Sequence, residues 1–190
     1  MTGLERDKTP KSLASSPSPL HDVPLSRWVA RFAYLVARTG PVLDLAAGGG
    51  RHSRYFLARG NRIVALDRDV TALADLAAHP AAEVIAADLE TGARWPLGER
   101  RFVGVIVTNY LYRPILPMII NAVAPGGALI YETFAAGNER FGKPSNPAFL
   151  LTPGELLVAV RDRLRVVAYE DLEVAEPRPA MVQRIAAVAP

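Results

Sequence analysis

Val42-Leu43-Asp44-Leu45-Ala46-Ala47-Gly48-Gly49-Gly50 is the stretch that decides the fold, and Arg51-His52-Ser53-Arg54 follows it directly. Its apolar first half suits a buried strand, which the three glycines end. Glycine lets a backbone adopt φ > 0 and approach a ligand closely, and a helix that begins after the turn points free N–H groups at that ligand. Asp44 is the exception, because a buried carboxylate is costly unless it meets a cationic or hydrogen-bonding partner. The stretch therefore predicts a strand–turn–helix site for a ligand with a cationic portion, such as an ammonium group.

The composition is that of a soluble globular protein. The 190 residues are 50% hydrophobic and 22% charged, which is enough for one domain with a full core. A net charge of +3 is too small to indicate nucleic-acid binding by itself. Cysteine is absent, which excludes disulfides, thiol catalysis and cysteine metal sites. We find no membrane span and no apolar signal-peptide core, so we expect a cytoplasmic protein that does not contact a membrane.

Residues 1–22 are rich in Ser, Pro and charge, so we expect a flexible N-terminal tail there and one folded domain over residues 23–190. Within that domain, strands are expected at 42–45, 62–66, 83–87, 102–108, 128–133, 164–169 and 182–188. Helices are expected at 24–38, 51–59, 69–79, 115–123 and 152–163, the last with a capping box that begins at Thr152. Residues 89–101 and 135–151 should be loops, the second long enough for a lid or binding loop, and residues 125–127 a turn.

The alternation of these elements predicts an α/β fold, with a doubly wound, mostly parallel sheet and helices on both faces. The last two strands have no helix between them and should pair as an antiparallel hairpin at or near one edge.

Four polar residues recur at the predicted strand ends. Asp44, Asp67, Asp88 and Asn109 are 23, 21 and 21 residues apart. In such sheets, ligands bind beyond the carboxyl ends of the strands. A lone Asp at such a position is also a common helix cap or turn residue, but four in succession favour one shared ligand site.

A dinucleotide is one candidate ligand, because an acid about 20 residues after a glycine turn is how a ribose diol is recognised. Asp67 occupies that position. The nicotinamide and flavin fingerprint G-x-G-x-x-G is incomplete, however, because Ser53 stands where the last glycine should be. Asp44 also places negative charge where a pyrophosphate would bind, so this interpretation is disfavoured.

The segments Asp44-Leu45-Ala46-Ala47-Gly48-Gly49-Gly50, Ala65-Leu66-Asp67 and Ala86-Ala87-Asp88 resemble the class I S-adenosylmethionine-dependent methyltransferases. The resemblance covers residues 24–190 and implies a Rossmann-like seven-stranded sheet with S-adenosyl-L-methionine as cofactor. It assigns the methionine part to the glycine turn, the ribose to Asp67 and the adenine amino group to Asp88 and Leu89. The full implied cofactor set is Asp44, Ala46, Gly48, Gly50, Arg51, Asp67, Arg68, Asp88, Leu89 and Asn109.

Two positions depart from the family pattern. Ala46 replaces the first turn glycine, which narrows backbone freedom, and Phe102-Val103 stands where the family often has Phe-Asp. The later segment from Tyr131 to Leu156 is similar to the bacterial small-molecule branch around tellurite-resistance-type methyltransferases. That branch implies a transferase that methylates a small molecule. Separately, we expect a monomer or a weak homodimer.

Methyl transfer depends mainly on aligning nucleophile, methyl group and sulfur and on excluding water. A soft nucleophile, such as a thiolate or a chalcogen oxyanion, would need no general base. We expect Asn109, Tyr110 and Arg113 to be catalytic. The wider set of acceptor-site candidates is Asn109, Tyr110, Tyr112, Arg113, Tyr131, Phe134, Arg140 and Lys143. Each has a structural alternative: Tyr131 also suits the core, and Arg113 also suits a cap or an ion pair.

Two other functions stay open. An RNA or protein methyltransferase is one, although Asn109-Tyr110-Leu111-Tyr112 lacks the prolines of amino-methylating motifs and no dense Lys/Arg stripe accompanies the aromatic residues. A non-catalytic S-adenosylmethionine-binding domain is the other. The histidines, His21, His52 and His79, lack metal-ligand spacing, so no metal is expected. His52 should lie at the surface or in the cap region of its helix.

Overall fold

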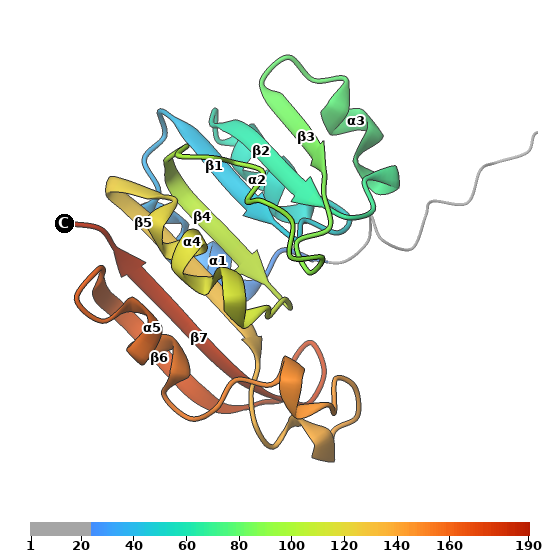
Figure 1. Ribbon diagram of the computed structural model, residues 1–190, viewed down its shortest axis with the longest axis vertical. Helices are drawn as coiled ribbons and strands as arrows, with labels where there is room; N and C mark the ends of the chain where they lie inside the picture. Colours follow the sequence, from blue (N-terminus) through green and yellow to red (C-terminus); the bar gives the residue numbers. More distant parts are fainter. Residues whose placement is uncertain (1–23) are drawn as a thin grey trace, which may run out of the picture.

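A computed structural model describes residues 24–190 (Figure 1). The tail predicted over residues 1–22 lies outside the described residues. The strands form one seven-stranded sheet in the order β3-β2-β1-β4-β5-β7-β6. Their bounds are β1 Pro41–Leu45, β2 Arg62–Asp67, β3 Ala82–Ala86, β4 Phe102–Thr108, β5 Val123–Phe134, β6 Arg165–Val174 and β7 Ala180–Val188.

Strands β1 to β5 are parallel, and β7 pairs antiparallel with both β5 and β6. The predicted mostly parallel, seven-stranded Rossmann-like sheet with a terminal hairpin is therefore confirmed. The hairpin is longer than expected, because its register continues to the pair Val174–Ala180.

Helices cover both faces of the sheet, as predicted (Figure 1). One core is formed with α1 (Arg27–Phe32), α2 (Arg51–Ala58) and α3 (Ala74–Ala77), whose Trp28, Phe56 and Leu76 are buried there. The other core is formed with α4 (Leu116–Asn121) and α5 (Glu155–Val160). Successive residues of β1 alternate between the two cores, as side chains of a strand must.

Several helices are shorter than the sequence predicts. The helix expected over 24–38 begins only after Ser26, whose Oγ accepts from the N–H groups of Trp28 and Val29, and it continues as the 3₁₀ turn η1 (Ala33–Leu35). The helix expected over 69–79 divides into η2 (Thr71–Leu73) and the four residues of α3. The helix expected over 115–123 starts with η3 (Arg113–Ile115) and ends at Asn121.

Two further expectations are corrected at the ends of elements. Gly154 has φ +74° and precedes α5, so the helix starts at Glu155 and Thr152 is not its N-cap. The Thr152 N–H and hydroxyl donate to Glu155 Oε2, and the Thr152 carbonyl accepts from the Glu155 N–H and from Gln183 Nε2. The turn expected at 125–127 lies within β5. There the register changes from Phe102–Val123 to Gly104–Ala128, so the extra residues form an irregularity inside the strand.

Residues 135–151 connect β5 to α5 and contain two 3₁₀ turns, η4 (Asn138–Arg140) and η5 (Pro147–Phe149). A bridge between Ala135 and Leu151 closes the base of this segment, which we call the β5–α5 loop. The buried Asn138 donates to the Pro144 carbonyl at 2.9 Å and accepts from the Met181 N–H at 3.1 Å. The loop is therefore tied to β7. Among residues 24–190, no helix is both long and apolar enough to cross a membrane.

Candidate functional site

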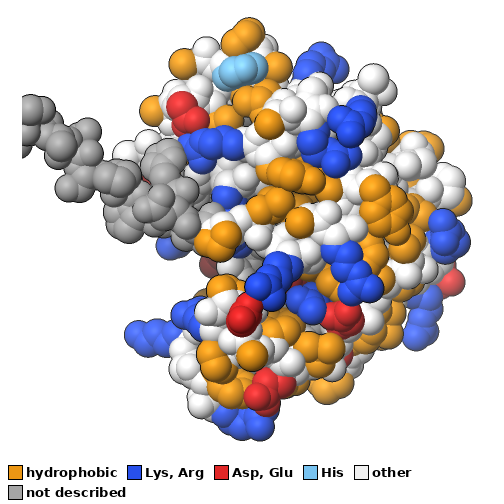
Figure 2. Space-filling view, turned by 180° about the vertical axis from the view of Figure 1, so that it is seen from behind, with side chains coloured by type: hydrophobic (Ala, Val, Ile, Leu, Met, Phe, Trp, Pro, Cys, Tyr) orange, Lys and Arg blue, Asp and Glu red, His pale blue; other side chains and the backbone are white. Residues whose placement is uncertain are grey.

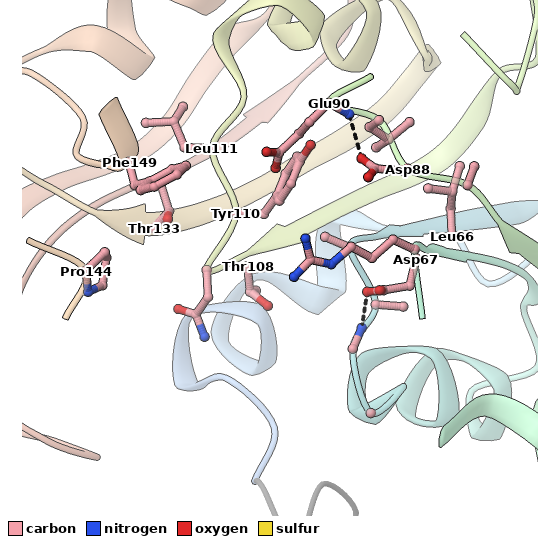
Figure 3. A pocket seen from close by; sticks show the side chains of 18 of the residues that line it. Leu66, Asp67, Asp88, Glu90, Thr108, Tyr110, Leu111, Thr133, Pro144 and Phe149 are labelled. Atoms are coloured by element: carbon pink, nitrogen blue, oxygen red, sulfur yellow. Dashed lines mark hydrogen bonds between the residues drawn. The ribbon is translucent and has the colours of Figure 1, made fainter. Parts of the chain in front are cut away.

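A cavity of about 640 Å³ lies at the carboxyl ends of the parallel strands (Figure 3). This volume is typical of small-molecule sites, which measure about 300–1,000 Å³. The segments that follow β1 to β5 and the β5–α5 loop all contribute to it. The lining residues are Ala46, Ala47, Gly48, Gly49, Arg51, Leu66, Asp67, Arg68, Ala87, Asp88, Leu89, Glu90, Thr108, Asn109, Tyr110, Leu111, Thr133, Phe134, Pro144 and Phe149.

The glycine turn forms one wall of the cavity, and two of its lining residues have positive φ. Ala46 has φ +55° and Gly48 has φ +54°, so the alanine that departs from the family pattern occupies a conformation that favours glycine. A Cβ at Gly48 would meet no atom within 4 Å, whereas one at Gly50 would lie 2.7 Å from Leu73. Gly50 is not a lining residue and is required for close packing against Leu73.

Asp44 is buried beneath this wall and is not a lining residue. Its Oδ2 accepts from the Ser53 N–H at 2.9 Å and from the Ser53 Oγ at 2.6 Å. Ser53 is the third residue of α2, and the preceding N-cap, Gly50, has no side chain to satisfy the free N–H groups. Asp44 therefore caps α2 from the neighbouring strand. Burial raises its pKa to about 7, against the lowering effect of the Ser53 hydrogen bonds.

His52 lies in the first turn of α2, in the expected cap region, but it is buried, so the expectation of a surface position is wrong. Its Nε2 accepts from the Ser26 N–H at 3.4 Å, and its Nδ1 lies 3.9 Å from Asp44 Oδ1. Burial lowers the pKa of His52 to about 3, with a smaller contribution from the Arg51 charge. The ring is consequently neutral at physiological pH and joins α2 to the start of α1.

Two strand-end acids face the cavity, as Figure 3 shows. Asp67 Oδ2 accepts from the Gly48 N–H at 2.8 Å, which joins the end of β2 to the glycine turn. Asp88 Oδ1 accepts from the Glu90 N–H at 2.9 Å. Each carboxylate keeps further lone pairs for a ligand, because an ionised carboxylate accepts about four hydrogen bonds.

Arg51 lines the cavity beside the glycine turn. Its Nη1 donates to the Pro24 carbonyl at 2.9 Å. Burial lowers the pKa of its guanidinium, while the charges of Glu132 and Asp44 act in the opposite direction. The group therefore stays cationic at this end of the cavity.

The other end of the cavity is formed after β4 and β5. Asn109 has φ +55°, and its N–H donates to the Glu132 carbonyl at 3.0 Å. The Tyr110 carbonyl accepts from the Tyr131 hydroxyl at 2.8 Å, which identifies Tyr131 as a core residue that supports the rim. The Tyr110 hydroxyl itself is buried without a partner, and burial raises its pKa well above the usual value.

Arg113 does not line the cavity. Its guanidinium binds both oxygens of Glu155, at 2.7 and 2.9 Å, and the carbonyls of Ala148 and Leu150, at 2.8 and 2.7 Å. It therefore fixes the end of the β5–α5 loop against α5. Tyr112, Tyr131, Arg140 and Lys143 also lie outside the lining, whereas Asn109, Tyr110 and Phe134 are part of it.

Sequence reasoning missed several lining residues at this end, among them Thr133, Pro144 and Phe149. The length of the loop indicated the region, but no local motif identifies which loop side chains turn inward. Among residues 24–190, no group of three or more His, Cys, Asp or Glu side chains is arranged to hold a metal ion.

No protein-family model matches the chain, and no curated protein matches its sequence significantly. Solved structures do match. The 1,6-didemethyltoxoflavin-N1-methyltransferase of Burkholderia thailandensis, solved with 1,6-didemethyltoxoflavin and S-adenosylhomocysteine, is 22% identical with a TM-score of 0.65, over 85% of this chain and 76% of that one. The TehB protein of Haemophilus influenzae is 19% identical with a TM-score of 0.67, over 85% of this chain and 61% of that one.

The glycopeptide N-methyltransferase MtfA, solved with S-adenosylhomocysteine, is 21% identical with a TM-score of 0.56, over 85% of this chain and 88% of that one. At these identities the likeness shows that the chain has the fold of these methyltransferases. The fold implied by the sequence resemblance is thereby confirmed.

Proposed function

We propose that the protein transfers a methyl group from S-adenosyl-L-methionine to a small-molecule acceptor by in-line displacement, within one domain over residues 23–190. The observation that supports this most directly is the convergence of the glycine turn, Asp67, Asp88 and Asn109 on one cavity. The spacing of these residues in the sequence predicts a shared ligand site of this kind. Methyltransferases of the same fold have been solved with S-adenosylhomocysteine, which supports the choice of cofactor.

The residues of the cavity fit this cofactor. Asp67 and Asp88 would accept hydrogen bonds from the ribose hydroxyls and the adenine amino group, and Leu89 would contact the adenine. Arg51 would pair with the methionine carboxylate, a role that its cationic side chain suits. Ala46 and Gly48 would let the backbone approach the methionine part, while Arg68 and Asn109 would complete the contacts. Asp44 and Gly50 would act indirectly: Asp44 caps α2, and Gly50 lets α2 pack closely against Leu73.

When bound, the cofactor supplies a methyl group already activated by its sulfonium. The protein must then position the acceptor and exclude water. Asn109 and Tyr110 line the cavity directly after β4 and would align the acceptor. Arg113 would act indirectly, by holding the β5–α5 loop.

A small molecule is favoured over a nucleic acid by the size of the cavity and by the charge on one face of the surface. On the face seen in Figure 2, Lys and Arg side chains are interspersed with hydrophobic and acidic ones instead of forming a continuous stripe. Nucleic-acid binding depends on a concentrated basic surface.

Calorimetric titration with S-adenosylmethionine and S-adenosylhomocysteine tests the cofactor assignment. Asp67→Ala removes charge-assisted hydrogen bonds worth about 1.5–3 kcal/mol, so we expect the Kd to rise by about 10- to 100-fold. Glu99→Ala, at an exposed acid outside the lining, serves as the matched control and should bind like the wild type. Absence of binding by the wild type, or equal binding by the Asp67 variant, would refute the assignment.

A further inference from the structure

Phe149 contributes an apolar ring to the cavity, and much of that ring is uncovered. The residue belongs to the lining and is nevertheless 45% exposed. Figure 3 shows it on the side of the cavity where Leu111 and Thr133 lie, whereas Asp67 and Asp88 lie on the other side. A ligand that covers exposed apolar surface gains free energy in proportion to the area removed from water. The ring is therefore suited to bind an apolar part of a ligand.

The backbone on both sides of Phe149 is held by one side chain. Arg113 donates from Nη1 to the Ala148 carbonyl at 2.8 Å and from Nη2 to the Leu150 carbonyl at 2.7 Å. The Phe149 N–H itself donates to the Asn146 carbonyl at 2.9 Å. Because the rotamers open to a side chain depend on the backbone that carries it, these bonds help to determine where the Phe149 ring lies.

Glu155 in turn fixes the orientation of Arg113. Its two carboxylate oxygens accept from Arg113 Nε and Nη2 at 2.7 and 2.9 Å. Glu155 Oε2 also accepts from the Thr152 N–H at 2.8 Å, so the carboxylate is held as well. A planar guanidinium that is bound through two parallel hydrogen bonds cannot rotate freely. The first turn of α5 is thereby connected, through Arg113, to the loop residues that flank Phe149.

Charged side chains also line the cavity, and they limit what the ring indicates about a ligand. They are Arg51, Asp67, Arg68, Asp88 and Glu90. The proposed function assigns the first four to the cofactor, and the Glu90 carboxylate is left to pair with a polar or cationic group of the acceptor. The ring therefore bears only on the part of the acceptor that lies beside it, whatever charge the rest of the acceptor carries.

We infer that Phe149 determines acceptor specificity by packing against an apolar group of the acceptor, and that Arg113 is the positioning residue that holds it there. This inference rests on the proposed function. Arg113 lies outside the lining, so it acts on the acceptor through Phe149 and not by contact. The role expected of Arg113 thus changes from catalysis to positioning, and the specificity lies in a residue that no sequence motif indicates.

The test uses stable cofactor analogues whose substituents enter the space of the acceptor. In each analogue nitrogen replaces the sulfonium sulfur, and a phenylethyl, carboxyethyl or aminoethyl group replaces the transferable methyl group. Calorimetry with the full chain gives the Kd of each analogue and of S-adenosylhomocysteine. We expect Phe149→Ala to raise the Kd of the phenylethyl analogue by about tenfold, because the ring no longer covers the phenyl group. The other three Kd values should stay within about twofold.

Phe141→Ala is the matched control, because Phe141 is a partly exposed aromatic residue of the same loop outside the lining. It should leave all four Kd values within about twofold. If S-adenosylhomocysteine does not bind to the wild type, the proposed function fails and this inference fails with it. If S-adenosylhomocysteine binds, but Phe149→Ala changes the Kd of all the analogues alike or of none, the inference alone is refuted.

Arg113→Lys tests the positioning role. Lysine keeps the charge, but its three donors lie on one atom and cannot replace the bonds to Glu155, Ala148 and Leu150. We expect the Kd of the phenylethyl analogue to rise by about three- to tenfold, while an unchanged Kd of S-adenosylhomocysteine shows that the variant is folded. Arg113→Lys combined with Phe149→Ala should lose no more than Phe149→Ala alone, because the two residues act as a unit. Additive losses, or no loss in Arg113→Lys, would contradict the positioning role.

Discussion

Replacing Asp44 by asparagine should change the pH dependence of stability in a way that can be calculated from its burial. The carboxyl is 2% exposed, and its pKa rises from the ordinary 3.8 to about 7 in the folded state. The protonated form is therefore favoured by folding. Its contribution is fully present below pH 3.8 and is lost as the pH rises to about 7. At about 1.4 kcal/mol for each pKa unit, the loss amounts to about 4 kcal/mol.

The side-chain amide of the Asp44→Asn variant would keep an oxygen for the Ser53 N–H and hydroxyl but would bury an NH₂ group that faces His52 Nδ1. An unpaired buried donor costs about 1–3 kcal/mol. We therefore expect Asp44→Asn to be less stable than the wild type at pH 5 by about that amount. Between pH 5 and 7 the wild type loses about 3 kcal/mol, because two pKa units of the shift lie in that range. At pH 8 the variant should therefore be as stable as the wild type or more stable by up to about 2 kcal/mol, a change of about 3 kcal/mol in favour of the variant.

The titration of His52 also changes the stability with pH, in the direction opposite to that of Asp44, so the two contributions have to be separated. Its folded pKa of about 3 lies below the ordinary 6.5, so its contribution is present above pH 6.5 and is lost as the pH falls toward 3. That loss is about 5 kcal/mol and opposes the gain from Asp44 over much of the same range. The wild type should consequently vary little between pH 4 and 6.5. Both proteins keep His52, so their difference isolates Asp44.

Urea unfolding followed by tryptophan fluorescence from pH 4 to 9, at constant ionic strength, measures the free energy of unfolding of each protein. Asp75→Asn is the control. Asp75 is exposed and pairs with Arg54, which lowers its pKa, so its replacement should produce no such change above pH 5. If the difference between wild type and Asp44→Asn stays constant within 1 kcal/mol from pH 5 to 8, the reasoning about the buried carboxyl is wrong.

Two further predictions concern the glycine turn and the β5–α5 loop. Gly50→Ala should destabilise by about 2–5 kcal/mol through positive φ and the clash with Leu73, whereas Gly48→Ala should cost only about 1–2 kcal/mol in the same urea assay. Equal costs would contradict the packing role of Gly50. Asn138→Ala leaves the Met181 N–H and the Pro144 carbonyl unpaired, so it should raise the acceptor KM several-fold. The Kd for S-adenosylmethionine, measured by calorimetry, should stay within twofold, and a parallel rise in both constants would refute a loop-specific effect.

The parts of the fold that depend on local pattern could be predicted from the sequence. The strand–glycine–helix unit and the strand ends at Asp67 and Asn109 are visible as runs of apolar residues that a polar residue or a glycine ends. Such boundaries depend only on residues that are adjacent in the sequence. The sequence predicts longer helices than the structure has, because over a few residues the apolar residues of a 3₁₀ turn have nearly the same spacing as those of an α-helix.

Features that depend on distant contacts could not be predicted in this way. Asp44 was correctly expected to need a hydrogen-bonding partner, but that partner is Ser53 within the protein and not a ligand. The burial of His52 depends on the start of α1 crossing over it. Phe149 joins the lining only because Arg113 fixes the loop from 36 positions earlier (149 − 113), a contact that no periodicity indicates.

The position of β7 between β5 and β6 has a consequence for the nascent chain. β5 ends at Phe134, and β7, its partner on that side, begins 46 positions later (180 − 134). At a synthesis rate of about 5–20 residues per second, the backbone groups along that side of β5 lack their native partner for about 2 to 9 seconds. An apolar strand with an open edge invites pairing with another chain during that interval. Folding in the cell therefore includes a window in which chaperone binding to β5 competes with aggregation, and it closes only when β7 has been made.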